Sequence, residues 1–593
     1  MFFLMKKKVS KTRQSKQKVV DVIFCVILFL LPFLHVNVGL NLADQGYNLY
    51  NFESFPDMNE TWMIATLAAN LTGKFFTLLP FGSCMLGMNV YCTLLLSGIS
   101  VGFYLLLSRN YSRYCVFVGL LIAICFSWAP KVTLYQYLSY YLFCLGAVIL
   151  VQGLKKEKRI FLYAAGIVLG INLFVRFPNI LQVSLILVVW GAGILGRRKI
   201  KDVVKDTLIC VAGYMTIVLP VIAGIELRMG FGTYLNMVES LFAMTDEAAT
   251  YTPFAMFSAM YSSYLENMKW FVWFPVVAVA GTVLYGFFAK KIFRYVVLAL
   301  TELAFLIVLR VYWYWGIFNM QYTAYHSVYV WGVCFLLLAM MVFAAAVFMK
   351  KLSVESRLYA LAGLLIIFIT PLGSNNALYS NFNNLYLLAP VAIGTLAAVW
   401  KEYGEKTQEA KKQVWKGSLK PSVMVAYTLC AVLLFQTFMF HFFFVFGDAG
   451  VGEGAKVQVE GNAKLAGIYT TEENARILSE LTAFCKQNNM DEREVIVWAH
   501  SPMIYYAMDF ECALGHSWPG LASYPYEEYC RDLESQETEP FVIYEAYSYP
   551  NLLEGAENMD AKTQALYHYM NERNYSEIFR NQSYVVCAPE NFE

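Results

Sequence analysis

KKKVSKTRQSKQKVVDVIFCVILFLLPFLHVNVGLNLADQGYNLYNF, residues 6–52, contains the pattern that decides the fold. Seven basic residues precede Val19, an apolar run continues to Val38, and an acidic residue follows at Asp44. A hydrocarbon core about 30 Å thick needs roughly 20 mostly apolar residues per helix, which this run supplies. It lacks a clear small-residue cleavage site, so we interpret it as a retained membrane anchor and not as a cleaved signal peptide.

Apolar runs of similar length recur through the first two thirds of the chain. The composition agrees, because 58% of the residues are hydrophobic and only 15% are charged, whereas soluble domains carry about 25% charged residues. We predict thirteen membrane spans, some of them short enough to be tilted or partly embedded. They are 19–38, 85–107, 114–130, 134–153, 160–178, 180–196, 207–225, 270–289, 294–312, 326–349, 358–373, 384–400 and 422–446.

The distribution of Lys and Arg predicts the orientation. With a cytoplasmic N-terminus, the inner segments hold 30 basic residues and the outer loops and membrane edges hold six. Positive segments resist translocation, and every inner loop in this arrangement is basic. An odd number of spans then places the C-terminus outside. The predicted location is the cytoplasmic membrane, with 1–18 as a cytoplasmic N-terminus and 19–446 as the membrane domain.

The C-terminal segment, 447–593, has a different composition. It holds nine of the 45 basic residues and 25 of the 43 acidic ones, a net charge of −16 that argues against a nucleic-acid partner. Short buried-strand patterns at 495–498, 541–544 and 584–587 alternate with helical patterns at 471–487 and 562–571. The predicted fold class is a polytopic all-α membrane domain followed by an extracytoplasmic α/β domain.

The cysteines do not predict a metal centre. Eight of the thirteen lie in predicted spans and Cys84 directly precedes one, and there they act as small apolar residues. The other four, Cys485, Cys512, Cys530 and Cys587, show no zinc-ligand spacing. The outer compartment permits disulfides, but four cysteines allow three pairings and the sequence does not choose among them.

Asp44 is the residue that we expect to carry chemistry. It follows the first span in the first outer loop, 39–84, and a carboxylate at that depth must be solvated in a cavity or paired. It would act as a general base or a metal ligand, and partial burial would raise its pKa for base work. The alternative is a structural role as a capping or turn residue before Gly46.

Other charged residues of the outer segments could assist Asp44. Glu53, Asp57 and Glu60 share its loop and could supply a second carboxylate, although each is also an ordinary solvated charge. Lys74, within an amphipathic stretch predicted to form one or two surface helices, could hold a phosphate or extend toward lipid headgroups. Arg176 is a second candidate, because its two parallel donors match phosphate oxygens, although a plain interfacial anchor would explain it equally well.

Glu60 and several further residues are candidates for substrate contacts. Tyr47 follows Gly46, and Tyr135 opens a Tyr-rich helix start that is also typical of a membrane interface. Asn375 and Asn376 offer paired amides suited to sugar hydroxyls, in a run that is also typical turn sequence. His35, His326 and Arg310 lie at predicted outer membrane edges and are weaker candidates.

The arrangement of these segments resembles the C-type glycosyltransferases, which include the protein O-mannosyltransferases and the aminoarabinose transferases of lipid A. The segments that carry the resemblance run through the membrane part of the chain. They are ADQGYNLYNF (43–52), LTGKFFTLLP (71–80), LYQYLSYYLFCLGAVILVQGL (134–154) leading into KKEKR, GIVLGINLFVRFPN (166–179) and ITPLGSNNALYSNFNNLYLLAP (369–390). The likeness is strongest in the first five spans.

The resemblance implies a function and a role for Asp44. In that superfamily the acid of the first loop is a catalytic base or a metal ligand, and the sugar arrives on a polyprenyl phosphate or pyrophosphate. Many relatives have a Glu beside this Asp, whereas this chain has Gln45. A metal held by two neighbouring carboxylates is therefore disfavoured, which leaves a single base, or a divalent metal shared with Glu53, Asp57 or Glu60.

We therefore expect a membrane glycosyltransferase that moves a sugar from a polyprenyl-phosphate donor to a lipid, glycan or protein acceptor, in contact with membrane lipid. A transporter or lipid flippase is the main alternative, but matching Gly/Pro-interrupted spans are missing and acids are nearly absent from mid-membrane. A polysaccharide polymerase or ligase, or a receptor-like protein whose C-terminal segment binds the ligand, would also fit parts of the pattern.

Overall fold

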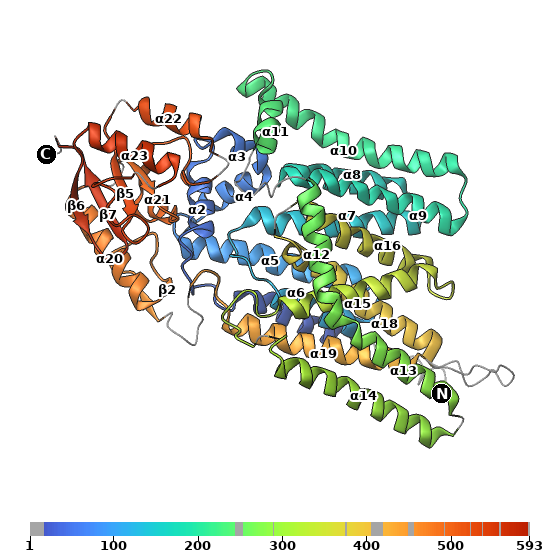
Figure 1. The fold of residues 1–593 in the computed structure, drawn as a ribbon. Helices are drawn as coiled ribbons and strands as arrows, with labels where there is room; N and C mark the ends of the chain where they lie inside the picture. The colour runs from blue at the N-terminus through green and yellow to red at the C-terminus, as the bar shows by residue number, and fades with distance from the viewer. Residues whose placement is uncertain are drawn as a thin grey trace.

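The computed structural model describes residues 17–243, 253–288, 290–318, 320–373, 376–404, 419–448, 456–490, 493–521, 524–536, 538–556 and 559–590. A bundle of long helices forms the larger part of the molecule, and a small sheet flanked by helices lies against one end of it (Figure 1). The helices of the first outer segment lie between the two parts.

Each of the thirteen predicted spans contains a helix. Short 3-10 segments, η1 (Leu31–Phe33), η2 (Phe177–Ile186) and η3 (Thr370–Gly373), adjoin three of these helices, and a short π-helix, η4 (Trp400–Gly404), follows another. The helices are a segment over 17–30, α5 (Met85–Leu107), α6 (Arg113–Cys125), α7 (Leu134–Lys156), α8 (Arg159–Leu173), α9 (Leu187–Gly196), α10 (Ile200–Met229), α13 (Trp273–Phe287), α14 (Lys291–Tyr314), α15 (Tyr329–Phe348), α16 (Val354–Ile369), α18 (Leu385–Val399) and α19 (Lys420–Phe443).

Length and hydropathy make this a multi-pass membrane protein. Within the described ranges, nine helical segments are long and apolar enough to cross a membrane. The number is ten if α12 (Pro253–Phe271) and α13, which meet at an angle of 44°, count as one span. The apolar helices α6 and α8 are shorter, with 13 and 15 residues. The total of thirteen crossings stays a prediction.

The first outer segment folds into three helices, α2 (Asp44–Ser54), α3 (Glu60–Ala65) and α4 (Leu67–Thr77). The last two lie within or next to the amphipathic stretch for which surface helices were expected. The sequence does not predict α2, because Gly, Asn and Ser lower its intrinsic helix propensity. Packing stabilises it instead, since Leu49 and Phe52 are almost fully buried. The other outer segments contain α11 (Thr233–Ala243) and α17 (Tyr379–Phe382).

The C-terminal part contains a five-stranded sheet with strand order β4-β3-β5-β7-β6. β3 pairs in parallel with β4 and β5, whereas β7 is antiparallel to β5 and β6. The strands are β3 (Glu494–Trp498), β4 (Glu511–Cys512), β5 (Phe541–Glu545), β6 (Ser576–Arg580) and β7 (Tyr584–Ala588); β1 (Val457–Gln458) and β2 (Tyr469–Thr470) form a separate pair. The helices are α20 (Glu472–Gln487), α21 (Met503–Met508), α22 (Tyr526–Glu534) and α23 (Ala561–Glu572). The predicted mixed α/β domain is therefore present.

Alternation along the strands buries both faces of this sheet. On one face, Ile496 and Val542 pack against α22 and α23. On the other, Val497 and Ile543 join a core that includes α20, α21 and residues of α2 and α5. The C-terminal domain and the first outer segment thus share one hydrophobic core. All thirteen cysteines are among the described residues and all are free, so none of the pairings left open by the sequence is formed.

A glycine allows α2 to lie directly on α21. A Cβ atom at Gly46 would lie 2.2 Å from the backbone nitrogen of Met503, a distance that no side chain could tolerate without movement. Gly46 is therefore part of a helix contact and not part of a turn after Asp44.

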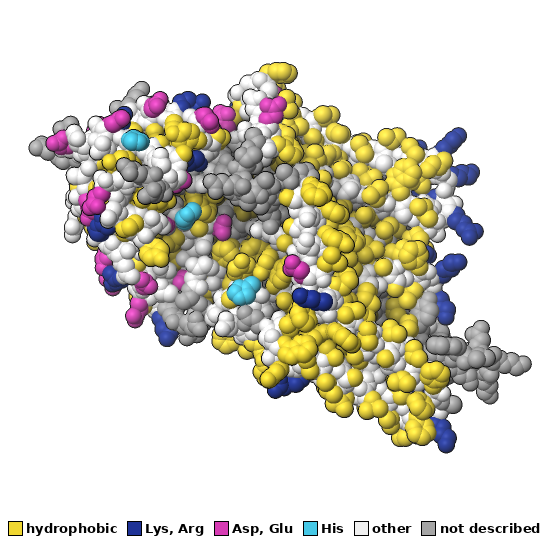
Figure 2. All heavy atoms as spheres, in the orientation of Figure 1, with side chains coloured by type: hydrophobic (Ala, Val, Ile, Leu, Met, Phe, Trp, Pro, Cys, Tyr) yellow, Lys and Arg dark blue, Asp and Glu magenta, His cyan; other side chains and the backbone are white. Residues whose placement is uncertain are grey.

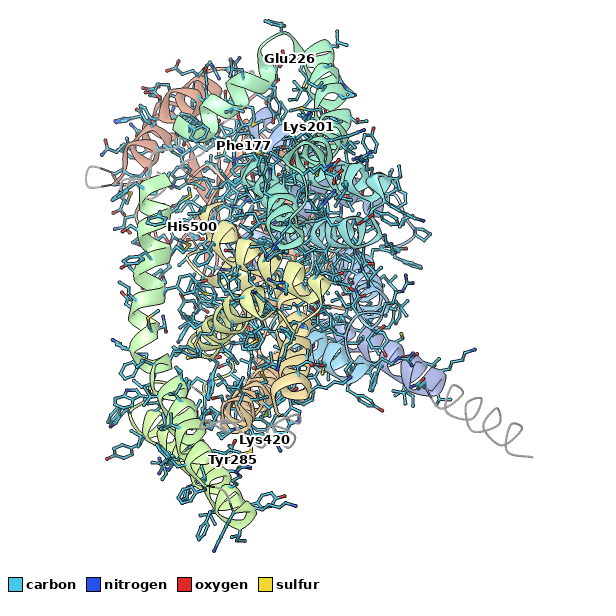
Figure 3. The ribbon with its side chains drawn as sticks, turned by 90° about the vertical axis from the view of Figure 1, so that its right-hand side faces the viewer. Phe177, Lys201, Glu226, Tyr285, Lys420 and His500 are labelled. Carbon is cyan, nitrogen blue, oxygen red and sulfur yellow. The ribbon has the colours of Figure 1, made fainter. Side chains whose placement is uncertain are left out.

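Charge is unevenly distributed over the molecule. In Figure 2, Lys and Arg line the edge of the bundle farthest from the sheet, acidic side chains are spread over the C-terminal domain, and apolar side chains cover the bundle surface. Figure 3 shows the bundle from this basic end, with Lys201 and Lys420 at the starts of α10 and α19. The two charged regions predicted from the sequence are thus at opposite ends of the structure.

Candidate active site

Asp44 is the first residue of α2, and a small hydrogen-bond network fixes the start of this helix. The backbone N–H of Gln45 donates to Asn41 Oδ1 at 3.0 Å, and Gln45 Oε1 accepts from the N–H of Asn41 at 3.1 Å. The helix follows Ala43 as its N-cap, so Asp44 is not the capping residue. Its carboxylate is half-buried, and burial raises the pKa of Asp44 above its ordinary value. This is the direction that general-base chemistry near neutral pH needs.

The carboxylate of Asp44 borders a cavity of about 760 Å³, here called the Asp44 cavity. Its walls come from the start of α7, the α6–α7 connection, a segment around Tyr325, the α17 region, and the chain that leaves α19. The polar lining includes Asp448, whose Oδ2 accepts from the N–H of Leu40 at 2.9 Å. The volume falls within the range of ligand sites, about 300–1,000 Å³.

Two more of the predicted residues lie at this cavity or beside it. Tyr135, at the start of α7, lines it and is close enough for the charge of Asp44 to act on its hydroxyl. The guanidinium carbon of Arg176 lies 5.8 Å from the centre of the Tyr135 ring, and Arg176 also interacts with Tyr140. Tyr135 thus lies close to both a carboxylate and a guanidinium, which come from two other segments of the chain.

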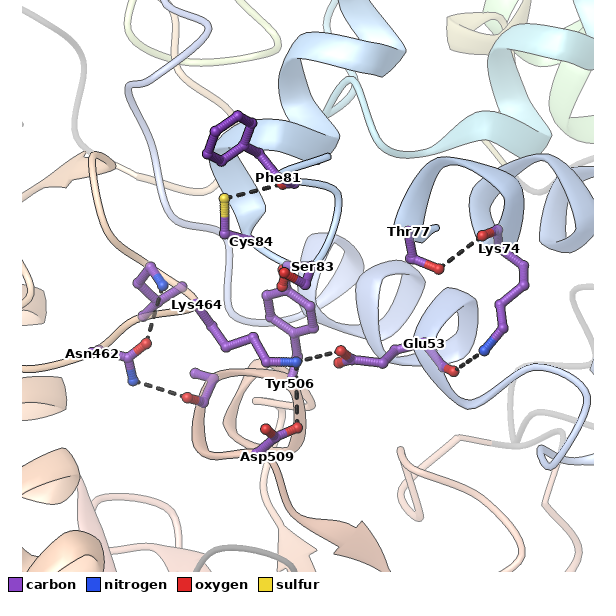
Figure 4. Close-up of polar contacts among 12 residues, drawn as sticks. Glu53, Lys74, Thr77, Phe81, Ser83, Cys84, Asn462, Lys464, Tyr506 and Asp509 are labelled. Atoms are coloured by element: carbon purple, nitrogen blue, oxygen red, sulfur yellow. Dashed lines mark hydrogen bonds and ion pairs between the residues drawn. The ribbon is translucent and has the colours of Figure 1, made fainter. Parts of the chain in front are cut away.

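Lys74 and Glu53 lie elsewhere. Glu53 is nine residues after Asp44 on α2, about 13 Å along the helix axis. Lys74 on α4 donates through Nζ to the backbone oxygen of Glu53 at 2.7 Å, and the Glu53 carboxylate forms an ion pair with Lys464 of the C-terminal domain (Figure 4). The structure does not place Lys74 at the Asp44 cavity; its hydrogen bond joins α4 to α2.

Tyr47, Asp57 and Glu60 line a second cavity, of about 420 Å³, between the first outer segment and the C-terminal domain. We call it the junction pocket. The Tyr47 ring stacks on His516 with centroids 5.5 Å apart, and its hydroxyl lies 3.3 Å from His516 Nε2. Asp57 and Glu60, two of the three carboxylates expected as partners of Asp44, thus line another cavity.

The remaining predicted residues are dispersed. Asn376 lines the Asp44 cavity, whereas Asn375 lies outside the described residues. His35 Nε2 contacts the backbone oxygen of Phe442 at 2.8 Å, and Arg310 on α14 lies 5.1 Å from the Trp313 ring. His326 is exposed, and its ring lies 5.8 Å from that of Tyr325, which lines the Asp44 cavity.

Sequence reasoning missed several residues that line the cavities. Lys131, in the α6–α7 connection, lines a small cavity next to the Asp44 cavity and donates through Nζ to the backbone oxygen of Leu34 at 3.0 Å. Burial lowers the pKa of Lys131 to about 7. Lys131 is one of the six basic residues in the predicted outer loops and membrane edges, and this feature of the sequence could have identified it. Nothing in the local sequence indicated His516, which meets Tyr47 only because the C-terminal domain packs on α2.

The carboxylates that could have completed a metal site do not gather around Asp44. Among the residues that the structure describes, no three His, Cys, Asp or Glu side chains are close enough together to hold a metal ion. Gln45 Nε2 points to Asn89 Oδ1 at 3.3 Å, and Glu53, Asp57 and Glu60 face other partners. These residues do not fit a divalent metal at Asp44.

Comparisons with known proteins complete the description. No family model matches the sequence, and no curated protein matches it. Among solved structures, the fold is similar to the crystal structure of ArnT from Cupriavidus metallidurans bound to undecaprenyl phosphate. The match covers 97% of this chain and 98% of that chain, with 11% sequence identity and a TM-score of 0.38.

Proposed function

We propose that this protein transfers a sugar from a polyprenyl-phosphate donor to a hydroxyl group of an acceptor, with Asp44 as the base. The observation that carries the proposal is the half-buried carboxylate of Asp44 at a large cavity, with Tyr135 and Arg176 beside it. A raised pKa makes Asp44 a better proton acceptor, and Arg176 supplies a positive charge for an anionic leaving group. The cavity adjoins the ends of α7 and α19, where a lipid-linked donor could enter from the membrane.

The reaction needs one proton transfer and one displacement. The Asp44 carboxylate removes the proton from an acceptor hydroxyl, and the acceptor oxygen attacks the anomeric carbon of the donor. A new C–O glycosidic bond forms while the bond between that carbon and the phosphate oxygen breaks. The polyprenyl phosphate leaves with the electron pair, and Arg176 stabilises its charge through paired donors. Phosphate is a good leaving group, so no strong general acid is required.

We place this reaction at the outer face of the cytoplasmic membrane. The support is the charge distribution, since the basic ends of the helices lie away from the C-terminal domain (Figure 2). Positive segments remain in the cytoplasm, so the Asp44 cavity and the C-terminal domain would both face outward. The acceptor class, whether lipid, glycan or protein, stays open in this proposal.

The test uses purified full-length protein with a set of polyprenyl-phosphate sugars that carry a radiolabel in the sugar. A transferase releases free polyprenyl phosphate and moves the label to the acceptor, whereas a flippase or transporter leaves the donor intact. The Asp44→Asn variant should express and fold normally but lose transfer. Full activity in this variant would remove Asp44 from the mechanism, and an intact donor under all conditions would contradict the proposed function.

A further inference from the structure

A second carboxylate, that of Asp448, lies at the Asp44 cavity and has no part in the proposed reaction. Asp448 follows the end of α19 by five residues and lines the cavity together with Asp44. Its Oδ2 accepts two hydrogen bonds, from the backbone N–H of Leu40 at 2.9 Å and from the Thr470 hydroxyl at 2.6 Å. Leu40 lies four residues before Asp44, and Thr470 belongs to β2. One side chain therefore joins the chain that leads into α2 to the C-terminal domain.

Backbone hydrogen bonds strengthen this connection. The N–H of Gly39 donates to the carbonyl oxygen of Tyr469 at 2.9 Å, and the N–H of Tyr469 donates to the carbonyl oxygen of Asn37 at 2.9 Å. Residues 37–39 thus form a parallel bridge with β2. The C-terminal domain therefore holds the chain between the first predicted span and α2 at two points, through the backbone and through Asp448.

Gly447, the residue before Asp448, packs against the start of α2. Its φ is +65°, and a Cβ atom there would lie 2.0 Å from Nδ2 of Asn41. Glycine allows the chain to pass this close to another side chain. Asn41 in turn exchanges hydrogen bonds with Gln45, the residue after Asp44. The segment that leaves α19 therefore packs on the residue that fixes the first turn of α2.

Not every contact of the C-terminal domain lies near the base. Lys464 forms an ion pair with Glu53, nine residues after Asp44 on α2. Lys464 is not among the described residues that line the Asp44 cavity, whereas Asp448 is. The two contacts therefore allow an effect of domain attachment to be separated from an effect on Asp44.

We infer that Asp448 is a positioning residue for Asp44, through which docking of the C-terminal domain sets the orientation of the base. The inference rests on the proposed function, because it concerns the base of that reaction. A base must lie within hydrogen-bond reach of the proton that it removes, so a small displacement of the first turn of α2 lowers the rate. Asp448 itself exchanges no proton in this scheme; it holds Leu40 and Thr470 together.

The first measurement compares kcat for sugar transfer in full-length variants. Asp448→Ala removes both hydrogen bonds and should lower kcat by about 10- to 100-fold, the size expected for a misplaced catalytic group. Asp448→Asn keeps an acceptor oxygen and should stay within about five-fold of the wild type. The matched control, Lys464→Met, breaks the other contact and should stay within about three-fold. KM for the donor should change by less than about three-fold in every variant, because the effect is on the base and not on donor binding.

The Asp44→Asn background separates positioning from a general structural effect. If Asp448 acts through Asp44, then Asp448→Ala should lower the residual rate of Asp44→Asn by less than about two-fold. An equal fold-loss in both backgrounds would show that Asp448 acts independently of the base and would overturn the inference. An unchanged kcat in Asp448→Ala would overturn it too, as would a loss in Asp448→Asn as large as that in Asp448→Ala.

Hydrogen exchange in detergent, without donor, tests the same connection independently of transfer. The backbone amides of residues 41–48 should exchange at least about ten-fold faster in Asp448→Ala than in the wild type, and at the wild-type rate in Lys464→Met. Thr470→Val removes one of the two hydrogen bonds and should give a smaller increase, which provides the test if Asp448→Ala does not fold. Unchanged exchange in both variants, or an equal increase in Lys464→Met, would exclude the inferred role.

The results also distinguish this inference from the proposed function. If Asp44→Asn abolishes transfer while Asp448→Ala has normal kcat and normal exchange, the inference fails and the proposed base stands. Full transfer in Asp44→Asn would instead remove the base on which the inference rests.

Discussion

The two ends of α2 carry carboxylates in opposite surroundings. Asp44, at the N-terminal end, borders a large cavity and, within the described residues, forms no ion pair. Glu53, near the other end, forms an ion pair with Lys464, which also lies 3.3 Å from Asp509 (Figure 4). Burial raises the pKa of both carboxyl groups, but only Glu53 has a fixed counter-charge. The same helix thus carries Asp44, whose carboxylate borders a cavity, and Glu53, whose carboxylate joins α2 to the C-terminal domain.

The comparison predicts very different effects for the same substitution at the two ends. Asp44→Asn should lower the rate of sugar transfer by about 10²- to 10⁴-fold, which is the usual contribution of a general base. Glu53→Gln should change that rate by less than about three-fold, because Glu53 lies away from the Asp44 cavity. Initial rates of polyprenyl phosphate release measure both. A larger loss of transfer rate in Glu53→Gln than in Asp44→Asn would assign the base to Glu53 and not to Asp44.

Removal of the positive charge beside the Asp44 cavity should have the next largest effect. A hydrogen bond to a charged group contributes about 1.5–3 kcal/mol, so Arg176→Ala should lower kcat/KM for the donor by about 10- to 100-fold. Arg176→Lys keeps the charge but loses the paired donors, so its kcat/KM for the donor should lie between the values of the wild type and of Arg176→Ala. Lys74→Ala is the matched control, because Lys74 contacts the Glu53 end of α2. If Lys74→Ala lowered kcat/KM for the donor more than Arg176→Ala did, the donor phosphate would bind at Lys74 and not at Arg176.

The pH dependence of transfer should follow Asp44. Burial raises its pKa, and a base works only when deprotonated, so the rate should rise with pH through a value above the ordinary range of Asp and then level off. Below that value the rate should fall about ten-fold per pH unit. The same profile should persist in Glu53→Gln, because protonation of Glu53 does not enter the reaction. If the fall in rate at low pH were absent from Glu53→Gln, then protonation of Glu53, and not of Asp44, would control the rate.

Local sequence determined more of the fold than of the site. Hydropathy located a helix at each predicted span, and short continuous apolar runs located β3, β5 and β7, because burial in lipid or on both faces of a sheet requires apolar side chains. Asp44 could be identified from the sequence because a carboxylate just beyond a membrane span must be solvated in a cavity or paired.

The grouping of the site residues was not predictable, because it depends on α2 and on what packs against it. Asp44 and Glu53 lie near the two ends of α2, and Glu60 begins α3. These carboxylates are close in sequence but lie at the Asp44 cavity, against Lys464 and at the junction pocket, respectively. No local pattern indicates that Lys464 or His516, more than 400 residues later, would meet this helix. Contacts between distant segments are set by the shared hydrophobic core and not by local propensity.

The smallest effect concerns the docking end itself. Lys464 is 16% exposed and Glu53 30% exposed, so their ion pair is only partly screened by solvent. Lys464→Met would leave Glu53 and Asp509 without their shared counter-charge and should lower the free energy of unfolding by about 1–2 kcal/mol, less than for a fully buried pair. The control Arg476→Met removes an exposed pair with Glu480, whose side chains are 51% and 40% exposed, and should cost under about 0.5 kcal/mol. Thermal denaturation in detergent compares the two variants.

Transfer by Lys464→Met should stay within about three-fold of the wild type below its Tm, because Lys464 supports the C-terminal domain and does not contact the Asp44 cavity. Equal stability of the two variants would mean that the shared hydrophobic core alone holds the domain on α2.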